Sequence, residues 1–107
     1  MCNIRIITES RIKGWSESHS MIEAALLHWL GLMKQSTAQS FTELHEIFKN
    51  VDLVEVASER NVCVFNLGYK KSAHRLIAAI HFDRQKVFVL RLLTHAEYDK
   101  DNWKNEL

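Results

Sequence analysis

The sequence of 107 residues predicts one α+β domain, in which an N-terminal strand and helices pack on one face of a mainly antiparallel sheet of four to five strands. Apolar residues recur at helical spacing in the first half of the chain, whereas from residue 53 onward the period changes to two. The length suits a single domain over residues 1–107. The absence of proline and the presence of only three glycines argue against a long flexible linker.

The N-terminal half predicts one strand followed by three helices. Its opening residues are short and β-branched, and Thr8 can cap the helix that follows. Ser20 with Glu23, and Ser40 with Glu43, each fit the S-x-x-E capping box that marks the start of a helix. After Ser20 the apolar residues form a broad helical stripe. We therefore expect a strand at 3–7 and helices at about 9–18, 20–35 and 41–48.

The C-terminal half predicts an antiparallel meander. Short apolar runs of period two are separated by polar turns, and consecutive strands joined in this way usually pair. The strand at 3–7 is expected to join the edge of the same sheet. The expected strands of the meander are 53–56, 62–67, 76–82 and 87–92.

The turn between the last two strands decides which way their basic side chains point. A two-residue turn would direct Arg91 beneath the helices, and burying an unpaired arginine is costly. A three-residue turn at 84–86 instead pairs Phe82 with Phe88 and Ala79 with Arg91. Because a slip of one residue exchanges the two faces of a strand, the three-residue turn is our prediction.

This register sorts the hairpin into two faces. Arg75, His81 and Arg91 are expected on the face away from the helices, with Arg75 opposite His95. The basic face is the predicted working surface. The predicted core face comprises Leu76, Ala78, Ile80, Phe82, Phe88 and Leu90.

The charge is distributed unevenly, although the net charge of the chain is only +1. Residues 1–59 hold five basic against eight acidic side chains, and residues 96–107 hold two against four. Residues 60–95 hold seven basic side chains and a single acid, Asp83. This concentration of positive charge favours an anionic partner.

Several other classes of protein do not fit the sequence. No apolar run approaches the length of a membrane-spanning helix, and the first ten residues lack a signal-peptide core. Cys2 and Cys63 are isolated, which suits a reducing compartment, so a cytoplasmic location is expected. The six histidines show no metal-binding spacing, and no glycine-rich phosphate loop is present, so no metal or cofactor is expected.

The basic face and the polar residues after it have the chemistry for cutting RNA without a metal. That reaction needs activation of a ribose 2′-hydroxyl, cations to stabilise the dianionic phosphorane, and an acid for the leaving 5′-oxygen. Arginine matches phosphate oxygens, histidine transfers protons near neutral pH, and tyrosine can stack on a base or donate a proton. The candidate catalytic residues are Arg75, Arg91, His95 and Tyr98, with Lys70 and Lys71 steering the RNA backbone.

Each candidate also has a structural explanation. The two arginines would suit a solvated strand face, His95 a loop in which the backbone satisfies it, and Tyr98 the packing of the C-terminal segment. Asp99 is expected to cap a terminal turn or to pair with a basic group. Trp103 is expected to anchor the C-terminus on the sheet.

Most of the chain resembles a known family. VFNLG at 64–68, RLI at 75–77, IHFDRQKVFVLRLLTHAEYD at 80–99 and Trp103 resemble the HigB family of bacterial toxins, within the RelE-like mRNA-interferase superfamily. RIITESRIKGW and SFTELHEIF in the first half resemble the family's opening strand and helix and its third helix. The most specific motif is THAEYD, which follows an arginine-bearing strand.

The resemblance implies a toxin that cuts mRNA, usually on the ribosome and without a metal. It implies neutralisation by a HigA-type helix-turn-helix antitoxin, with operator DNA contacted only through the toxin–antitoxin complex. Arg75, Arg91, His95 and Tyr98 match polar positions of the family by position. Asn66 matches the strand asparagine of the family. The candidate RNA-binding residues are Asn66, Lys70, Lys71, His74 and His81.

The sequence departs from the family in one loop. Family members commonly have F-N-I-G-G-N-x-x-R, whereas here the segment 65–75 replaces the second glycine and the asparagine and is two residues longer. Lys70, Lys71 and His74 in this loop either add RNA contacts or displace its usual geometry. The main alternative function is an inactive module of the same fold that only binds RNA, ribosome or antitoxin. A DNA-binding repressor is disfavoured because no helix-turn-helix pattern is present.

Overall fold

The computed structural model describes residues 4–7, 9–18, 22–49, 51–57, 60–67, 74–100 and 102–107. One short strand and three helices precede four strands, as predicted, and two short helices follow them. The elements in order are β1 (Arg5–Ile6), α1 (Glu9–Ser18), α2 (Glu23–Gln35), α3 (Phe41–Ile47), β2 (Val51–Glu55), β3 (Asn61–Leu67), β4 (His74–His81), β5 (Lys86–Thr94), α4 (His95–Asp99) and α5 (Asn102–Glu106).

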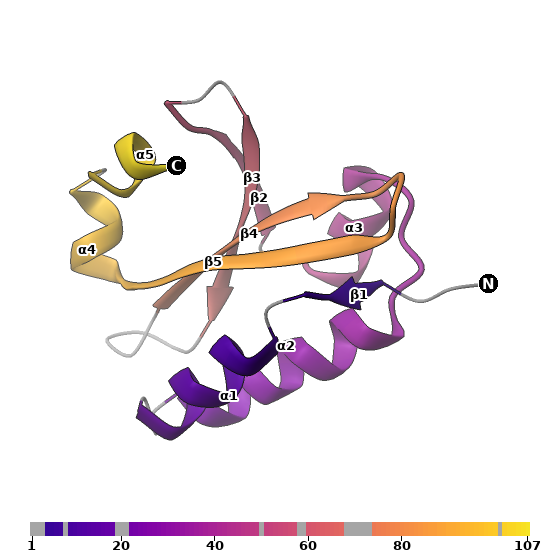
Figure 1. Ribbon diagram of the computed structural model, residues 1–107, viewed down its shortest axis with the longest axis horizontal. Coiled ribbons are helices and arrows are strands. Elements are labelled where there is room, and N and C mark those ends of the chain that lie inside the picture. The colour runs from indigo at the N-terminus through magenta and orange to yellow at the C-terminus, as the bar shows by residue number, and fades with distance from the viewer. Residues whose placement is uncertain are drawn as a thin grey trace.

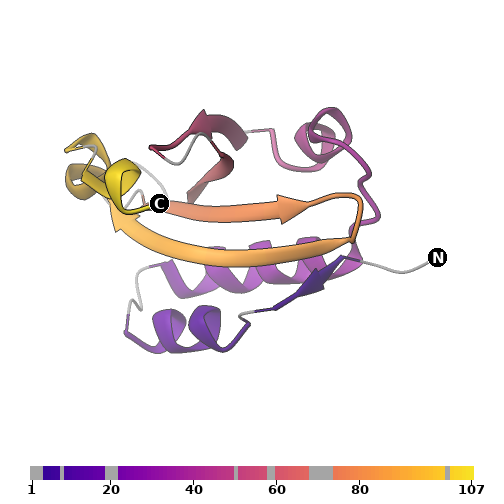
Figure 2. The same cartoon turned by 45° about the horizontal axis from the view of Figure 1, so that its top comes forward.

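The five strands form one sheet in the order β1-β5-β4-β3-β2. Strands β2 to β5 make the predicted antiparallel meander, and β1 joins its edge parallel to β5. Helices α1 and α2 lie side by side against one face of the sheet, whereas α4 and α5 lie near the far end of the β4–β5 hairpin (Figures 1 and 2). The predicted α+β fold is therefore confirmed. No helix in the described ranges is long and apolar enough to cross a membrane.

The sheet has an apolar cluster on each face. The larger cluster, beneath α1, α2 and α3, includes Trp29, Phe65, Leu76 and Val87. We call this side the helix face. The smaller cluster, on the side that α5 covers, consists of Val56, Val62, Val64, Ile77 and Trp103. We call this side the second face. Because β3 is covered on both faces, its sequence is an almost unbroken apolar run.

The helix starts were predicted with mixed success. Ser40 caps α3 as expected, since its hydroxyl accepts a hydrogen bond from the Glu43 amide at 3.3 Å. Helix α2 begins at Glu23, and its N-cap Ile22 makes no side-chain cap bond. Ser20 and Thr8 lie outside the described residues.

The predicted turn of the β4–β5 hairpin is also wrong. Ile80 pairs with Val87, and Ala79 pairs with Phe88 rather than with Arg91. The residues between the strands are 82–85, where Gln85 adopts a left-handed φ of 52°. The Gln85 amide stabilises this turn because its Nε2 donates to the Ala38 carbonyl at 2.7 Å and to the Phe82 carbonyl at 2.9 Å.

The change of turn moves two predicted core residues, Phe88 and Leu90, to the second face. Val87 and Val89 occupy the helix face of β5, and each is fully buried. Phe88, predicted in the core, therefore shares the second face with Ala79, and Leu90 packs against the smaller cluster. A β-bulge then follows, because Ala78 pairs with Val89 whereas Ile77 pairs with Arg91.

The bulge decides where Arg91 points. Leu90 is the extra residue, and one extra residue exchanges the two faces of the strand beyond it. Arg91 thereby shares the second face with Ile77, and strand alternation gives Arg75 and His81 that face too. The predicted common face is correct, but the bulge and not a three-residue turn produces it.

Candidate functional site

Three elements bring polar side chains together at the C-terminal end of β5. Arg75 comes from β4, Arg91 from β5 and Tyr98 from α4. Arg75 pairs with Leu93, so Arg75 and Arg91 are diagonal neighbours on one face, roughly 7 Å apart by strand geometry. We call these three residues the arginine–tyrosine cluster.

Tyr98 is held by two side chains. The Arg75 guanidinium carbon lies 5.5 Å from the centre of the Tyr98 ring, a cation–π contact. Trp103 stacks on the same ring with a centroid separation of 5.3 Å, and its indole N–H donates to the Tyr98 carbonyl at 3.1 Å. Trp103 is itself buried on the second face, as expected for an anchor of the C-terminus. Its contacts fix the position of Tyr98 beside Arg75.

Arg91 lies at the edge of a hollow of about 240 Å³ between β5 and the two C-terminal helices. The Arg91 guanidinium donates to the Leu90 carbonyl at 2.9 Å and is half-buried. Lys100 adds a second cation to the lining of this hollow, and Glu97 adds a carboxylate. The site therefore offers cationic groups to an anion at the surface.

A third arginine supports the bulge from the other side. Arg11 in α1 donates through Nη1 to the Val89 and Leu90 carbonyls, both at 3.1 Å. Strand β1 ends at Ile6, so beyond Val87 this edge of β5 has no neighbouring strand among the described residues. Arg11 satisfies backbone carbonyls that a longer strand would otherwise pair. Nothing in the sequence pattern marked Arg11, because its partners are 78 and 79 positions away.

The THAEYD motif contains a helix cap. Thr94 is the N-cap of α4: its hydroxyl accepts from the Glu97 amide at 3.2 Å, and its own amide donates to the Glu97 carboxylate at 3.0 Å. The hydrogen bond from the Thr94 backbone lowers the pKa of Glu97, with smaller contributions that include the charge of His74. Glu97 therefore stays ionised at neutral pH and serves the cap. The T-x-x-E spacing was visible in the sequence but was not used to predict α4.

His95 is the first residue of α4, and its side chain lies outside the described part of the structure. The predicted placement of His95 opposite Arg75 is wrong, because Arg75 pairs with Leu93. The turn and the bulge together shift the far end of β5 by two residues along β4, so that Leu93 occupies the position predicted for His95. Tyr98 is the residue that meets Arg75.

The predicted RNA-binding residues do not form one group. Asn66 pairs with Arg75 and belongs to the same row across the sheet. His74 pairs with Thr94 at the end of β4, and Lys70 and Lys71 lie outside the described residues. His81 is exposed at the opposite end of β4, six positions and roughly 20 Å from Arg75. His81 therefore belongs to a separate part of the second face.

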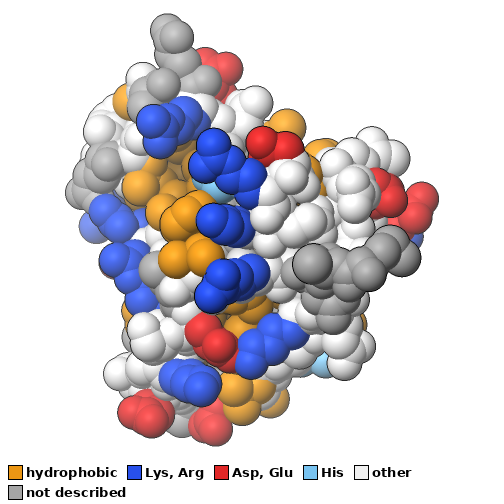
Figure 3. All heavy atoms as spheres, turned by 45° about the vertical axis from the view of Figure 1, so that its right-hand side comes forward, with side chains coloured by type: hydrophobic (Ala, Val, Ile, Leu, Met, Phe, Trp, Pro, Cys, Tyr) orange, Lys and Arg blue, Asp and Glu red, His pale blue; other side chains and the backbone are white. Residues whose placement is uncertain are grey.

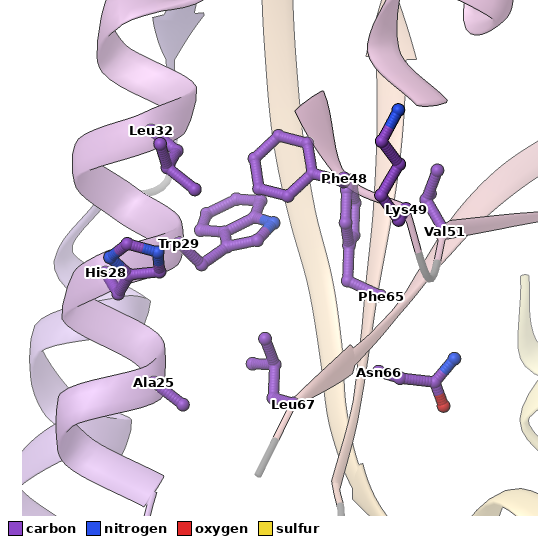
Figure 4. Close-up of a pocket in the computed structure, with 10 residues that line it drawn as sticks. All are labelled: Ala25, His28, Trp29, Leu32, Phe48, Lys49, Val51, Phe65, Asn66 and Leu67. Atoms are coloured by element: carbon purple, nitrogen blue, oxygen red, sulfur yellow. The ribbon is translucent and has the colours of Figure 1, made fainter. Parts of the chain in front are cut away.

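A further hollow on the helix face contains none of the proposed catalytic side chains. It measures about 200 Å³ and lies between α2 and β3, around Trp29, Phe48 and Phe65 (Figure 4). Trp29 and Phe48 each meet the Phe65 ring edge to face, with ring centroids 5.4 Å and 5.0 Å apart respectively. Asn66 lines its rim but points away from Trp29 (Figure 4). This hollow is part of the apolar support of the sheet.

The sheet topology, with N-terminal helices on one face, is consistent with a RelE-like toxin fold. The chain belongs to the HigB toxin family: the family model described as the RelE-like toxic component of a toxin–antitoxin system matches residues 22–101. A comparison with curated proteins finds no match. The family resemblance seen in the sequence is thereby confirmed, and membership of a toxin–antitoxin system implies an antitoxin partner.

Proposed function

We propose that this toxin is a metal-independent endoribonuclease that cleaves mRNA on the ribosome and thereby arrests translation. The observation that carries the proposal is the arginine–tyrosine cluster, in which Arg75, Arg91 and Tyr98 converge from three elements on one face. In the reaction, the ribose 2′-oxygen attacks the adjacent phosphorus and the 5′-oxygen leaves. The products carry a 2′,3′-cyclic phosphate and a 5′-hydroxyl.

The two arginines provide the electrostatic part of this reaction. Their guanidinium groups match phosphate oxygens and stabilise the charge that develops on the phosphorane. His95 and Tyr98 supply the proton transfers at the 2′-oxygen and the 5′-oxygen. Glu97 is assigned no proton transfer, because its lowered pKa makes it a weak base and its carboxylate accepts the hydrogen bond from the Thr94 amide.

The remaining assignments follow the same surface. Asn66 shares the transverse row of Arg75, which supports a role in holding the RNA backbone. RNA contacts are also assigned to His74, at the start of β4, and to Lys70 and Lys71, which lie outside the described residues. The antitoxin is of the HigA type with a helix-turn-helix domain, operator DNA is contacted only through the complex, and the protein acts in the cytoplasm.

The test compares cleavage of mRNA by wild-type toxin and by Arg91→Ala in a purified translation system. We expect Arg91→Ala to reduce the rate by about 100- to 1,000-fold, as for loss of one preorganised donor to a transition-state oxyanion. Lys13→Ala, which removes an exposed cation from α1, is the matched control and should cleave normally. Mapping of cyclic-phosphate ends identifies the chemistry.

Three results would contradict the proposal in different ways. Undiminished cutting by Arg75→Ala, Arg91→Ala and His95→Ala would show that the site is elsewhere. Translation arrest by wild-type toxin without any cut ends would favour the inactive binding module of the same fold. Inhibition by EDTA that added metal reverses, on naked RNA, would contradict a metal-independent reaction.

A further inference from the structure

Four basic residues lie in a line across the sheet at the end nearest the β4–β5 turn. Arg5 of β1 pairs with Lys86 of β5, and Lys86 pairs with His81 of β4. Directly paired residues point to the same face. Arg60, which precedes β3, lines the same hollow as His81. We call Arg5, Lys86, His81 and Arg60 the basic row.

The basic row adjoins the largest hollow described on the second face, about 780 Å³. Its floor is apolar, with Val62, Ala79, Phe88 and Leu90, and Leu107 closes one side. The half-buried Phe88 ring meets the His81 ring edge to face at 5.3 Å. Figure 3 shows a band of Lys and Arg side chains beside a strip of hydrophobic ones on the side of the molecule that carries the turn.

The basic row costs stability in the free protein. Like charges directly opposite each other on neighbouring strands repel, and Arg5 faces Lys86 across such a pair. Within the described ranges, no carboxylate forms an ion pair with any member of the row, whereas Glu9 pairs with Lys34 elsewhere on the surface. An aligned set of cations beside an aromatic floor is the combination that binds single-stranded nucleic acid, with phosphates along the cations and a base on the ring.

We propose that the basic row and its hollow form a second RNA subsite, which binds a segment of the message flanking the bond that is cut. The backbone phosphates follow the row, and one base enters the hollow against Phe88. His81 lies roughly 20 Å along β4 from Arg75, so the two sites contact different nucleotides of one strand. This inference rests on the proposed function, since it assumes that the arginine–tyrosine cluster holds the cleaved phosphate.

The first experiment measures binding of a single-stranded RNA oligonucleotide with 2′-O-methyl groups throughout, which prevent cleavage. Arg60→Ala combined with Lys86→Ala should weaken binding about tenfold and reduce the slope of log affinity against log salt by about 1.4, because two phosphate contacts are lost. Phe88→Leu keeps an apolar floor but removes the ring. It should weaken binding at least about fivefold with an unchanged salt slope.

The matched control is Lys13→Ala combined with Lys49→Ala, which removes two exposed cations that lie outside the basic row. It should bind with wild-type affinity and salt slope, and melting curves of all variants check that they fold. Wild-type binding by both the Arg60/Lys86 variant and the Phe88 variant would overturn the subsite. Loss of antitoxin binding with unchanged RNA binding would instead make the basic row a protein-docking surface, and would also overturn it.

A second experiment separates this inference from the proposed function. On ribosomes, messages truncated just before or just after the codon that is cut are too short on that side to reach from the arginine–tyrosine cluster to the basic row. If both proposals hold, the Arg60/Lys86 variant cleaves the message that lacks the flanking segment as wild type does but cleaves the full-length message with a raised KM. If the wild type cleaves neither substrate, with or without ribosomes, the proposed nuclease fails, and the binding experiment still decides the subsite.

Discussion

The two faces of the sheet differ in how much apolar surface they bury and in what surrounds it. The helix face buries large side chains such as Trp29, Met33 and Leu44, all at most 2% exposed. Among the described residues, the cluster of the second face has five buried members, with Arg75 and Arg91 beside them. The helix face therefore supplies most of the folding free energy, since burial of apolar area dominates it. The second face buries enough to hold α5 and leaves its cations at the surface.

The comparison also explains how a small domain carries repelling charges. The cations of the second face are mounted on strands whose opposite side is fixed by the larger cluster. Changes on the helix face should therefore alter stability first, whereas changes on the second face should alter activity first. Four substitutions, ordered by the expected loss of stability, can break or refine this division.

The largest effect is expected for Trp29→Ala on the helix face. Trp29 is 2% exposed and contacts both Phe48 and Phe65, so its removal leaves a large cavity. The free energy of unfolding should fall by about 3–5 kcal/mol, measured by urea denaturation. Trp29→Phe, which keeps a ring, should lose less than half as much. A smaller loss for Trp29→Ala than for any second-face variant below would contradict the division.

Trp103→Ala should lower the free energy of unfolding by about 3 kcal/mol, the low end of the range for loss of a buried tryptophan. The loss is limited because α5, which Trp103 anchors, can fray without unfolding the rest of the domain. Unlike Trp29→Ala, it should also reduce mRNA cleavage when assayed well below its melting temperature, since Tyr98 loses its stacking partner. Trp103→Phe keeps a ring but removes the N–H donor to the Tyr98 carbonyl. It should retain more activity than Trp103→Ala; equal activity of the two would show that stacking is unimportant.

Arg11→Ala tests a side chain on the helix face that acts on the second face. This variant should lower the free energy of unfolding by about 1–3 kcal/mol, because the Val89 and Leu90 carbonyls lose a charged hydrogen-bond donor. Because the bulge directs Arg91, kcat should fall about tenfold with little change in KM, whereas a purely structural role would leave kcat unchanged after correction for folded protein. Arg11→Lys should restore part of kcat. Lys13→Ala on the same helix is the control.

Thr94→Ala should have the smallest effect, about 1 kcal/mol, because it removes the side-chain half of the α4 capping box. The folded-state pKa of Glu97 lies below its ordinary value of 4.5, so the stability linked to it is present above that pH and is lost as the pH falls below it. Urea midpoints at pH 7 and pH 3 should therefore differ less for Glu97→Gln than for wild type. An unchanged difference would show that the cap bonds do not affect this titration.

Much of the fold was predictable because its signals are local. The Ser40–Glu43 box set the start of α3, and short apolar runs separated by polar turns marked all four strands of the meander. The composition of the hairpin also indicated a basic surface. The Thr94–Glu97 box carried an equally local signal for α4, but its residues were interpreted as reaction chemistry.

The amino-acid sequence by itself determined the elements, the fold class and the family, because capping, periodicity and motif depend on residues close in the chain. Only the tertiary structure decided the register of β5. The Gln85 turn is tied to the Ala38 carbonyl, and the bulge to Arg11, across 47 and 78–79 positions respectively. Those two distant contacts turn Arg91 toward the second face and move Tyr98 into the place expected for His95. Long-range hydrogen bonds of this kind have no local pattern, so only the folded chain shows them.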